Sequence, residues 1–324
     1  MWVAVLATVV AVVFALRLFY RRTSGRCHSQ RKLVGKTVII TGASAGIGKY
    51  TAMDLVRRGA RVILACRNLQ KACKVAAEIS KAAGSGAGDL IVRQLDTSDL
   101  ASVRKFAEEI LQTEKALHIL INNAGIYGSE KRQMTREGLE VTMATNHYGH
   151  FLLTNLLLEL LKKSCPSRVI NVSSAGHFMA STLNPDALNF EDDSYTSMRA
   201  YCRSKLCNIL FTRELADRLK GTGVTANSLH PGVVHTELLS SHPNSIMTWL
   251  LKLTNSIICK DEELGAQTTI HLAVSDEVEG ITGRYFVDCK EAKPSSLAQQ
   301  KRLAQLLWKA SEVDVERKPS EIPY

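Results

Sequence analysis

The sequence predicts an α/β protein in which a doubly wound parallel sheet is flanked by helices and preceded by a transmembrane helix. Three observations carry this prediction: short apolar runs alternate with helical patterns, the first run leads into a glycine-rich loop, and residues 2–20 are apolar except for Arg17. With 324 residues, 45% hydrophobic and 22% charged, the composition is that of an ordinary globular protein with one large domain and additional segments.

The first strand and the loop after it predict a dinucleotide site. Residues 37–40 form an apolar run that breaks into Thr41-Gly42-Ala43-Ser44-Ala45-Gly46-Ile47-Gly48, and a helical pattern covers residues 46–58. Glycines at this spacing permit a tight turn, close approach of the backbone to a pyrophosphate and close packing of helix on strand. The free N–H groups and the dipole of the helix N-terminus would hold the phosphates. Taken alone, the loop also fits an ordinary strand-to-helix turn. The expected cofactor contacts are Gly42, Ser44, Ala45, Gly46, Ile47 and Gly48.

The second strand, residues 61–67, ends where dinucleotide-binding folds distinguish their cofactors. A carboxylate at this point binds the ribose 2′-hydroxyl of NAD, whereas a cation accommodates the 2′-phosphate of NADP. The chain has Cys66-Arg67 and no acid here, with Lys49 as a second candidate cation. We therefore predict NADP(H), held by Arg67. A solvated arginine at the end of a strand is the simpler alternative.

The remaining elements continue the alternation. The pattern predicts helices at residues 68–83, 99–114, 137–163 and 199–219, and strands at residues 90–95, 118–121, 168–172 and 224–229. Ser98 is the expected N-cap of the helix at residues 99–114. Such alternation with right-handed crossovers is typical of a single sheet of the Rossmann type.

Residues 1–21 are predicted to anchor the chain in a membrane, and residues 22–36 to form a basic linker. At about 1.5 Å per residue, a helix over residues 2–20 reaches roughly 28 Å, close to the thickness of bilayer hydrocarbon. A cluster of cations without any acid follows this apolar run and places the rest of the chain in the cytosol. A monotopic hairpin or surface helix, or a cleaved signal, is the alternative. The cluster consists of Arg17, Arg21, Arg22, Arg26, Arg31, Lys32 and Lys36.

The positive charge does not indicate a nucleic-acid partner. Subtracting the seven clustered cations from the net charge of +10 leaves +3 for the rest of the chain. The eight cysteines show neither a CxxC pair nor zinc-ligand spacing, so we expect reduced thiols. His147, His150 and His177 also lack the spacing of metal ligands, and we expect no bound metal.

Five motifs occur in the order and spacing of the short-chain dehydrogenase/reductases, and the chain resembles that family over about residues 35–290. They are the glycine-rich loop, Asn122-Asn123-Ala124-Gly125, a serine after the fifth strand, Tyr201-Cys202-Arg203-Ser204-Lys205, and Pro231-Gly232. The apolar N-terminus, Ala65-Cys66-Arg67 and Gly283-Arg284-Tyr285-Phe286 are similar to the membrane-bound retinol dehydrogenase group. The resemblance implies a catalytic domain at residues 37–290 and leaves residues 291–324 as a polar C-terminal tail.

Tyr201 and Lys205 stand four residues apart in a predicted helix, so both side chains project from one face. A free tyrosine has a pKa of about 10, and a nearby ammonium is expected to lower it, which makes the pair a general acid/base. Without the other motifs, such a pair is common on helix surfaces. The resemblance implies that Tyr201 exchanges a proton with the substrate oxygen and that Lys205 also binds the nicotinamide ribose. It further implies Ser174 at the substrate oxygen, with Ser173 as the alternative, Asn146 at a relay water, and cofactor contacts from Asp96, Asn123, Ala124, Gly125 and Thr236.

The resemblance also implies a lipophilic substrate, with retinal and retinol as the first expectation. Because NADPH predominates in a reducing cytosol, reduction is the expected direction. Steroid, isoprenoid or lipid aldehydes are alternatives, and an inactive NADPH-binding membrane scaffold is a hypothesis from another class. The long interval at residues 178–196 is expected to form a loop near the substrate. Residues 236–260 form an amphipathic pattern that either roofs the site beside the bilayer or packs on the domain or between subunits. The endoplasmic reticulum is the expected membrane, a mitochondrial membrane is the alternative, and a homodimer is one assembly that the resemblance allows.

Overall fold

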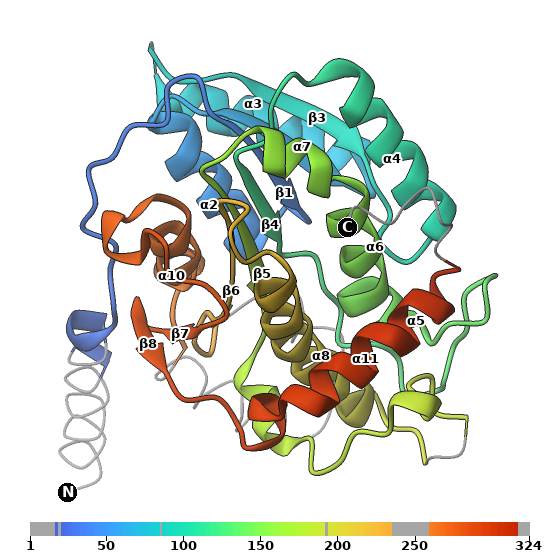
Figure 1. Cartoon of the computed structure of the whole chain (residues 1–324). Coiled ribbons are helices and arrows are strands. Elements are labelled where there is room, and N and C mark those ends of the chain that lie inside the picture. The colour runs from blue at the N-terminus through green and yellow to red at the C-terminus, as the bar shows by residue number, and fades with distance from the viewer. Residues whose placement is uncertain (1–16, 19–20, 85, 192–193, 235–258, 317–324) are drawn as a thin grey trace, which may run out of the picture.

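The computed structural model describes residues 17–18, 21–84, 86–191, 194–234 and 259–316. Their centre is an eight-stranded sheet with the order β3-β2-β1-β4-β5-β6-β7-β8 (Figure 1). Neighbouring strands pair in parallel except β7 and β8, which are antiparallel. The order of the first six strands is that of a Rossmann-type sheet, so the predicted α/β class is confirmed. The strands are β1 (Thr37–Thr41), β2 (Arg61–Cys66), β3 (Leu90–Gln94), β4 (Ile119–Asn122), β5 (Ser167–Val172), β6 (Val224–His230), β7 (Tyr285–Val287) and β8 (Lys290–Ala292).

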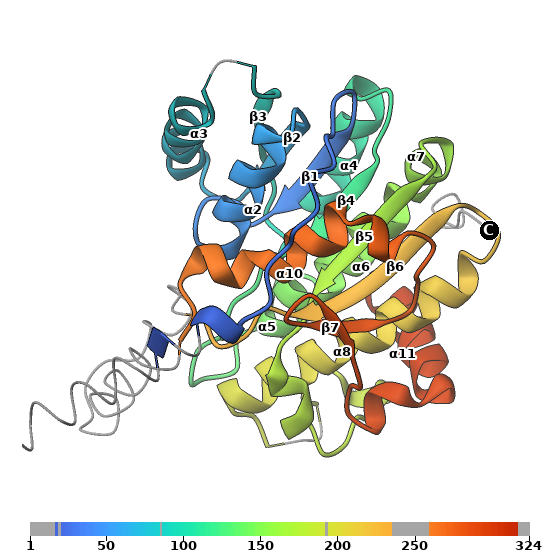
Figure 2. The same cartoon turned by 90° about the vertical axis from the view of Figure 1, so that its left-hand side faces the viewer.

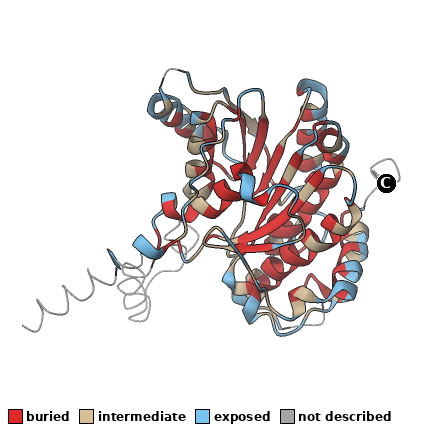
Figure 3. Ribbon diagram, turned by 60° about the vertical axis from the view of Figure 1, so that its left-hand side comes forward, coloured by how far each residue is buried: buried red, intermediate tan, exposed pale blue. Residues whose placement is uncertain are grey.

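Helices cover both faces of this sheet (Figures 1 and 2). Because side chains alternate along a strand, Val38 and Ile40 pack toward one group of helices and Ile39 toward the other. The strands and the inward faces of the helices are buried, whereas the outward faces are exposed (Figure 3). The first group is α2 (Gly46–Arg57), α3 (Leu69–Ala83) and α10 (Glu262–Val274); the second is α4 (Leu100–Thr113), α6 (Gly149–Leu156), α7 (Leu158–Lys163), α8 (Ser197–Arg218) and α11 (Lys301–Asp314).

The predicted strands and most predicted helices agree with the observed ones within two residues at each end. The N-cap of α4 differs from the expectation. Asp99, not Ser98, accepts hydrogen bonds from the backbone N–H groups of Ala101 (2.9 Å) and Ser102 (3.2 Å). The Ser98 hydroxyl instead donates to the Asp96 carboxylate at 2.7 Å. Aspartate is as strong an N-cap as serine, and the turn at Asp96 holds Ser98 away from the helix.

The helix predicted over residues 137–163 begins late and is interrupted. It starts as α5 (Val141–Met143), where the Glu140 carboxylate caps the Met143 N–H at 2.8 Å. It then widens into a π-helical segment, η1 (Ala144–Tyr148), before α6 and α7 continue it. Short π-helical segments within α-helices are frequent at functional sites. Here the segment contains Asn146.

The C-terminal boundary predicted at residue 290 is wrong for the described part of the chain. Helix α11 packs on α8, and Trp308 lies in the core with 1% of its surface exposed. Its ring contacts those of Phe151 (4.9 Å between centroids) and Phe211 (5.7 Å). The Ser311 hydroxyl is also 2.8 Å from His147 Nε2. Residues 301–314 are therefore part of the catalytic domain.

Trp308→Ala is expected to lower the free energy of unfolding by about 3–5 kcal/mol, because it removes a large buried ring and leaves a cavity. Chemical denaturation of the detergent-solubilised protein measures the change. Leu306→Ala is the matched control, since Leu306 is on the same helix but 43% exposed, and it should cost less than about 1 kcal/mol. If Trp308→Ala lowered the free energy of unfolding as little as Leu306→Ala, α11 would be a dispensable tail.

The described part of the predicted basic linker packs against the domain. Gly25 N–H donates to the Asp288 carboxylate at 3.1 Å, and Cys27 N–H donates to Gln267 Oε1 at 3.1 Å. These contacts attach the segment to α10 and to the turn between β7 and β8. Within the ranges that the structure describes, no helix has the length and apolar character needed to cross a bilayer. The predicted anchor at residues 1–21 lies almost wholly outside those ranges.

Candidate active site

The predicted site residues lie at or beside the carboxyl ends of strands β1 to β5. The order of the sheet reverses between β1 and β4, and α/β proteins bind ligands in the crevice at such a switch point. Thr41 ends β1 and Asn122 ends β4, so the glycine-rich loop and the Asn122–Gly125 motif become neighbours. The sequence separates them by about eighty residues, but the sheet brings them together.

The glycine-rich loop has the geometry of a phosphate cradle. Gly42 (φ 66°) and Gly46 (φ 56°) adopt left-handed conformations that favour glycine. A Cβ on Gly48 would lie 2.7 Å from both the Gly42 carbonyl oxygen and Asn123 Nδ2, so only glycine fits this approach. Helix α2 begins after Ala45 without a side-chain cap and without an acid in its first turn, which leaves the N-terminal N–H groups for an anion. This donor set fits a pyrophosphate. Of the other predicted contacts, Ser44 lies in the turn before the helix, and Ile47, in the first turn of α2, packs against the core.

Arg67 lies directly after β2 and extends into solvent, with 72% of its side chain exposed. Its Nε is 4.0 Å from the Asp96 carboxylate, so the two predicted adenosine-side residues are adjacent. The second candidate cation, Lys49, has an ion-pair partner, since its ammonium is 2.6 Å from the Glu78 carboxylate on α3. Arg67 is therefore the better placed of the two for a 2′-phosphate.

The Asn123–Gly125 segment is fixed by Thr41. The Thr41 hydroxyl oxygen accepts hydrogen bonds from the N–H groups of Asn123 and Ala124, each at 2.9 Å, and Asn123 Nδ2 donates to the Thr41 carbonyl at 2.8 Å. A Cβ on Gly125 would lie 3.3 Å from Asn146 Oδ1 and 3.4 Å from Lys205 Nζ. The backbone of the motif thus passes directly beside two predicted catalytic side chains.

Tyr201, Lys205 and Ser174 converge where α8 passes the end of β5. Lys205 Nζ lies 5.6 Å from the centroid of the Tyr201 ring and donates to the Val172 carbonyl at 3.2 Å. Ser174 lies close enough to the Tyr201 phenol to lower its pKa. The hydroxyl of Ser173, the alternative serine, donates to the Lys205 carbonyl at 2.7 Å inside the core. Ser174 is therefore the serine that faces Tyr201.

The pKa of Tyr201 moves in the direction opposite to the sequence expectation. Burial of the phenol raises its pKa, and the hydrogen bond with Ser174 offsets part of that rise. Burial also lowers the pKa of Lys205 to about 8. The cost of burying each charged form therefore outweighs the attraction between ammonium and phenolate, and at neutral pH both the phenol and the amine are protonated.

Asn146 is held from three directions within the π-helical segment. Its Oδ1 accepts from the Ile126 N–H at 2.8 Å, and its Nδ2 donates to the Ile126 carbonyl and the Ser204 hydroxyl, each at 2.9 Å. The Ser204 hydroxyl in turn donates to the Tyr201 carbonyl at 2.7 Å. Ser204 thus links Asn146 to the helix that carries Tyr201. Thr236, the remaining predicted cofactor contact, lies outside the described residues.

Sequence reasoning missed three groups that position these side chains. Gly176 allows the close approach of the Tyr201 ring, since a Cβ there would lie 3.2 Å from it. His177 Nε2 accepts from the Ser295 N–H at 3.1 Å, so its Nδ1 carries the hydrogen and donates to the Ser174 carbonyl at 2.7 Å. Ser204 is the third. Of these three groups, only Ser204 had a signal in the sequence, because it follows Tyr201 by three residues in the same predicted helix.

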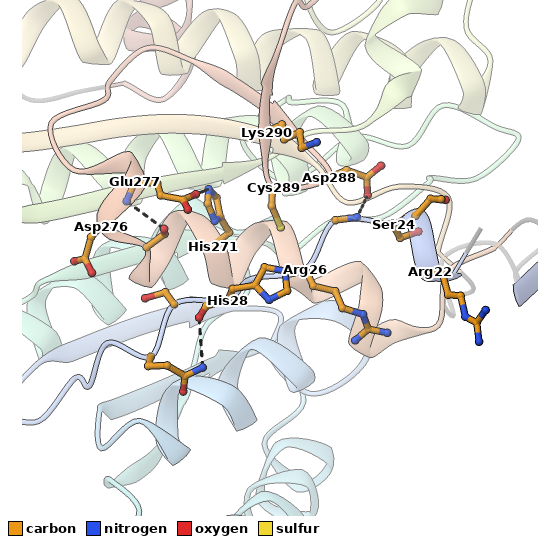
Figure 4. Close-up of a pocket in the computed structure, with 15 residues that line it drawn as sticks. Arg22, Ser24, Arg26, His28, His271, Asp276, Glu277, Asp288, Cys289 and Lys290 are labelled. Carbon is orange, nitrogen blue, oxygen red and sulfur yellow. Dashed lines mark hydrogen bonds and ion pairs between the residues drawn. The ribbon is translucent and has the colours of Figure 1, made fainter. Parts of the chain in front are cut away.

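A cavity of about 660 Å³ lies elsewhere, between the N-terminal segment, α10 and the turn after β7 (Figure 4). The exposed cations Arg22, Arg26 and Lys290 lie along it. Its three acids lie near other groups: Asp288 near the buried Lys260, Asp276 near Arg31 at 2.8 Å, and Glu277 near His271 at 4.0 Å. The predicted catalytic and cofactor residues do not line this cavity, so its volume is not that of the active site.

Comparisons with known proteins agree with these motifs. A family model described as short chain dehydrogenase matches residues 36–186. The chain is 49% identical over 293 residues to retinol dehydrogenase 14 of Homo sapiens, covering 87% of this chain and 86% of that protein. It is 46% identical over 293 residues to retinol dehydrogenase 11 of Mus musculus, covering 89% of each.

Solved structures share the fold and include a complex with the predicted cofactor. An uncharacterized protein from Mycobacterium Paratuberculosis gives a TM-score of 0.71 at 33% identity, covering 91% of this chain and 98% of that one. The RhlG/NADP active-site complex of Pseudomonas aeruginosa gives a TM-score of 0.62 at 25% identity, covering 79% and 95%. The family and this neighbour support a nicotinamide cofactor. The chain therefore belongs to the short-chain dehydrogenase/reductase family of oxidoreductases, within its retinol dehydrogenase group.

Proposed function

We propose that the protein is an NADP(H)-dependent oxidoreductase that interconverts a lipophilic carbonyl compound and its alcohol, with retinal and retinol as the first substrate pair. The observation that carries the proposal is the convergence of Tyr201, Lys205, Ser174 and Asn146 beside the glycine-rich loop. A protein that only bound NADPH would need the loop but not this set of four.

Tyr201 acts as the general acid in the reducing direction. A phenol is protonated at neutral pH, and burial raises the pKa of Tyr201 further. Tyr201 gives this proton to the carbonyl oxygen of the substrate. The Ser174 hydroxyl donates a hydrogen bond to the same oxygen and holds it against Tyr201. The nicotinamide, when bound, supplies the hydride. Lys205, charged below pH 8, stabilises the phenolate that remains after proton transfer. Asn146 holds a relay water through which the phenol regains its proton.

Exposed apolar side chains near Tyr201 support a lipophilic substrate. Phe178 and Met179 end the 3-10 segment η2 (Ala175–Met179), which follows Ser174, and they are 56% and 65% exposed. Met198, at the start of α8, accepts a hydrogen bond from the Tyr127 hydroxyl at 3.2 Å, and the Tyr127 and Tyr201 rings are 5.2 Å apart. Clusters of large apolar side chains exposed to solvent often mark binding sites for apolar partners. We propose that these four side chains contribute to the substrate site.

The preference for NADP(H) rests on Arg67. Its guanidinium is exposed beside Asp96, and no carboxylate follows β2 at the position that would bind a free 2′-hydroxyl. A guanidinium also binds a phosphate through paired hydrogen bonds. NADPH as the cofactor makes reduction the working direction.

The proposal includes a membrane anchor at residues 1–21, with the catalytic domain in the cytosol. The apolar run, the cations after it and the attachment of residues 25 and 27 to the domain support it. The endoplasmic reticulum is the proposed membrane, and a mitochondrial membrane is the alternative. Extraction of membranes at alkaline pH tests the anchor: the full chain should stay with the lipid, and a chain lacking residues 1–21 should not.

Oxidation of NADPH, with NADH in parallel, tests the proposed reaction. Detergent-solubilised protein is offered all-trans-retinal and then a panel of steroids, isoprenoid aldehydes and medium-chain aldehydes. Turnover of retinal with strong NADPH preference would support both the substrate and the cofactor. Turnover of other panel members alone would keep the mechanism and replace the substrate. NADPH binding without any turnover would favour the scaffold hypothesis.

The pKa of Lys205 predicts how the activity depends on pH. Its lowered value of about 8 means that the ammonium is charged below that pH and neutral above it. The pH profile of kcat/KM reports the ionisations of the free enzyme, so kcat/KM for reduction should fall as pH rises through about 8. Lys205→Arg stays charged throughout, and its residual activity should lack this decline. A wild-type profile that is flat from about pH 7 to 9 would contradict the assignment.

A further inference from the structure

His150 is a buried side chain that connects the cofactor loop to the catalytic helix. It lies in the first turn of α6, with 2% of its surface exposed. Its Nε2 is 2.8 Å from the hydroxyl oxygen of Thr41 at the end of β1. Its Nδ1 is 3.1 Å from the carbonyl oxygen of Asn146 in the π-helical segment. One imidazole ring therefore contacts both the end of β1 and the π-helical segment that contains Asn146.

The partners of the ring fix its tautomer and the direction of each hydrogen bond. A carbonyl oxygen only accepts, so Nδ1 carries the hydrogen and donates it to Asn146. Burial, together with the nearby Lys205 ammonium, lowers the pKa of His150 to about 4, so the ring is neutral and Nε2 is an acceptor. The Thr41 hydroxyl must then donate to Nε2.

This orientation completes the bonding of Thr41. With its hydrogen directed at His150, the hydroxyl oxygen presents its lone pairs to the N–H groups of Asn123 and Ala124, both at 2.9 Å. A hydroxyl pointing elsewhere would find only the Ile121 carbonyl, at 3.4 Å. The ring thus selects the rotamer of Thr41 that holds the Asn123–Gly125 backbone.

On the side of Asn146, the hydrogen bonds continue to the residues proposed to transfer the proton. The Asn146 side chain is bonded to Ile126 and, through Ser204, to the backbone of Tyr201. Fixing the Asn146 carbonyl therefore fixes the turn of helix that presents the Asn146 side chain. No charged group takes part in the connection, so it acts through geometry.

We propose that His150 is a positioning residue that holds the cofactor-binding Asn123–Gly125 backbone and the catalytic Asn146 in register, through one hydrogen bond from Thr41 and one to the Asn146 carbonyl. Substitutions of His150 can remove either of its two hydrogen bonds separately. Glutamine carries its amide oxygen to the position of Nε2 and can accept from Thr41, whereas asparagine reaches only the position of Nδ1 and can donate to Asn146.

The experiment compares His150→Gln, His150→Asn and His150→Phe in the full-length protein. NADPH affinity is measured by fluorescence titration without substrate, and kcat and KM are measured with the carbonyl substrate. We expect His150→Asn and His150→Phe to weaken NADPH binding about tenfold, since a displaced backbone misplaces its ligand. His150→Gln should keep NADPH affinity within about threefold but lower kcat about tenfold.

His147→Asn is the matched control. His147 is also buried and lies in the π-helical segment just before α6, but its ring bonds to Ser311 on α11 instead of Thr41. We expect it to lower thermal stability as much as His150→Asn while leaving NADPH affinity and kcat unchanged. The proposal is overturned if the two asparagine variants behave alike in NADPH affinity and kcat.

Thr41→Val keeps the inference testable if the His150 variants do not fold. This nearly isosteric change removes only the hydroxyl and should weaken NADPH binding to the same extent, and Thr41→Ser should restore it. Unchanged affinity in Thr41→Val would overturn the proposal. The expected change in kcat rests on the proposed function, but the NADPH affinities do not. If the wild-type protein binds NADPH but reduces no carbonyl compound, the proposed reaction is refuted. The NADPH affinities of the variants then still test the role of His150.

Discussion

Tyr201→Phe is expected to reduce carbonyl turnover by about a hundred- to ten-thousandfold while NADPH binding persists. The substitution removes only the phenolic hydroxyl, which is the group that gives its proton to the substrate oxygen, and general acid catalysis typically contributes a factor of this size. The ring that packs beside Gly176 is retained, so the fold should be unaffected. Steady-state kinetics with retinal and NADPH titration of the same preparation measure the two quantities.

Tyr127→Phe is the control for this experiment. Its ring lies 5.2 Å from that of Tyr201, and its hydroxyl bonds to Met198. Loss of that hydroxyl should change KM for an apolar substrate by a few fold at most and leave kcat nearly intact. If kcat fell as far in Tyr127→Phe as in Tyr201→Phe, the experiment would not identify Tyr201 as the general acid. If Tyr201→Phe retained full turnover, the general-acid role would be refuted outright.

The residues proposed to perform the chemistry could be selected from the sequence because their types and spacings are constrained by that chemistry. Glycines at 42, 46 and 48 are required by backbone conformation and close approach, and a tyrosine four residues before a lysine is required by one helix face. The alternation of strands and helices was readable for a similar reason. Each buried strand is a continuous apolar run, and each crossover helix has one apolar face.

The residues that position the chemistry could not be predicted, because their partners are distant in sequence. Thr41 and His150 are 109 residues apart, and His177 and Ser295 are 118 apart. Nothing in the local sequence around either histidine distinguishes it from His147, which faces the opposite side of the same helix. Only the packing of β1, α6 and the C-terminal segment decides which ring touches the site.

Two errors had different physical origins. The C-terminal helix was missed although Leu303, Leu307, Trp308 and Ser311 form a readable inward face at helical spacing. The pKa of Tyr201 could not have been obtained from spacing at all. Spacing places an ammonium near a phenol, but burial decides whether the attraction or the loss of solvation prevails, and here the loss of solvation prevails.

Arg67→Gln is expected to weaken NADPH binding by roughly ten- to a hundredfold and to leave NADH binding almost unchanged. The guanidinium would form charge-assisted hydrogen bonds with the 2′-phosphate, and each such bond contributes about 1.5–3 kcal/mol. NADH has no phosphate there, so it loses nothing. The KM values of the two cofactors, measured with one substrate at constant ionic strength, give the change in preference.

Arg67→Asp should go further and invert the preference toward NADH. A carboxylate after β2 can bind the ribose 2′-hydroxyl, and beside Asp96 it would add a second negative charge that repels a 2′-phosphate. Lys49→Gln is the discriminating control, since Lys49 is paired with Glu78 and should contribute little. If Lys49→Gln weakened NADPH binding and Arg67→Gln did not, the ion pair with Glu78 would have to open on binding, and the cation that recognises the phosphate would come from α2. Because Arg67 is 72% exposed and its nearest carboxylate, that of Asp96, is 4.0 Å away, binding through Arg67 requires no such rearrangement. The preference should therefore follow residue 67.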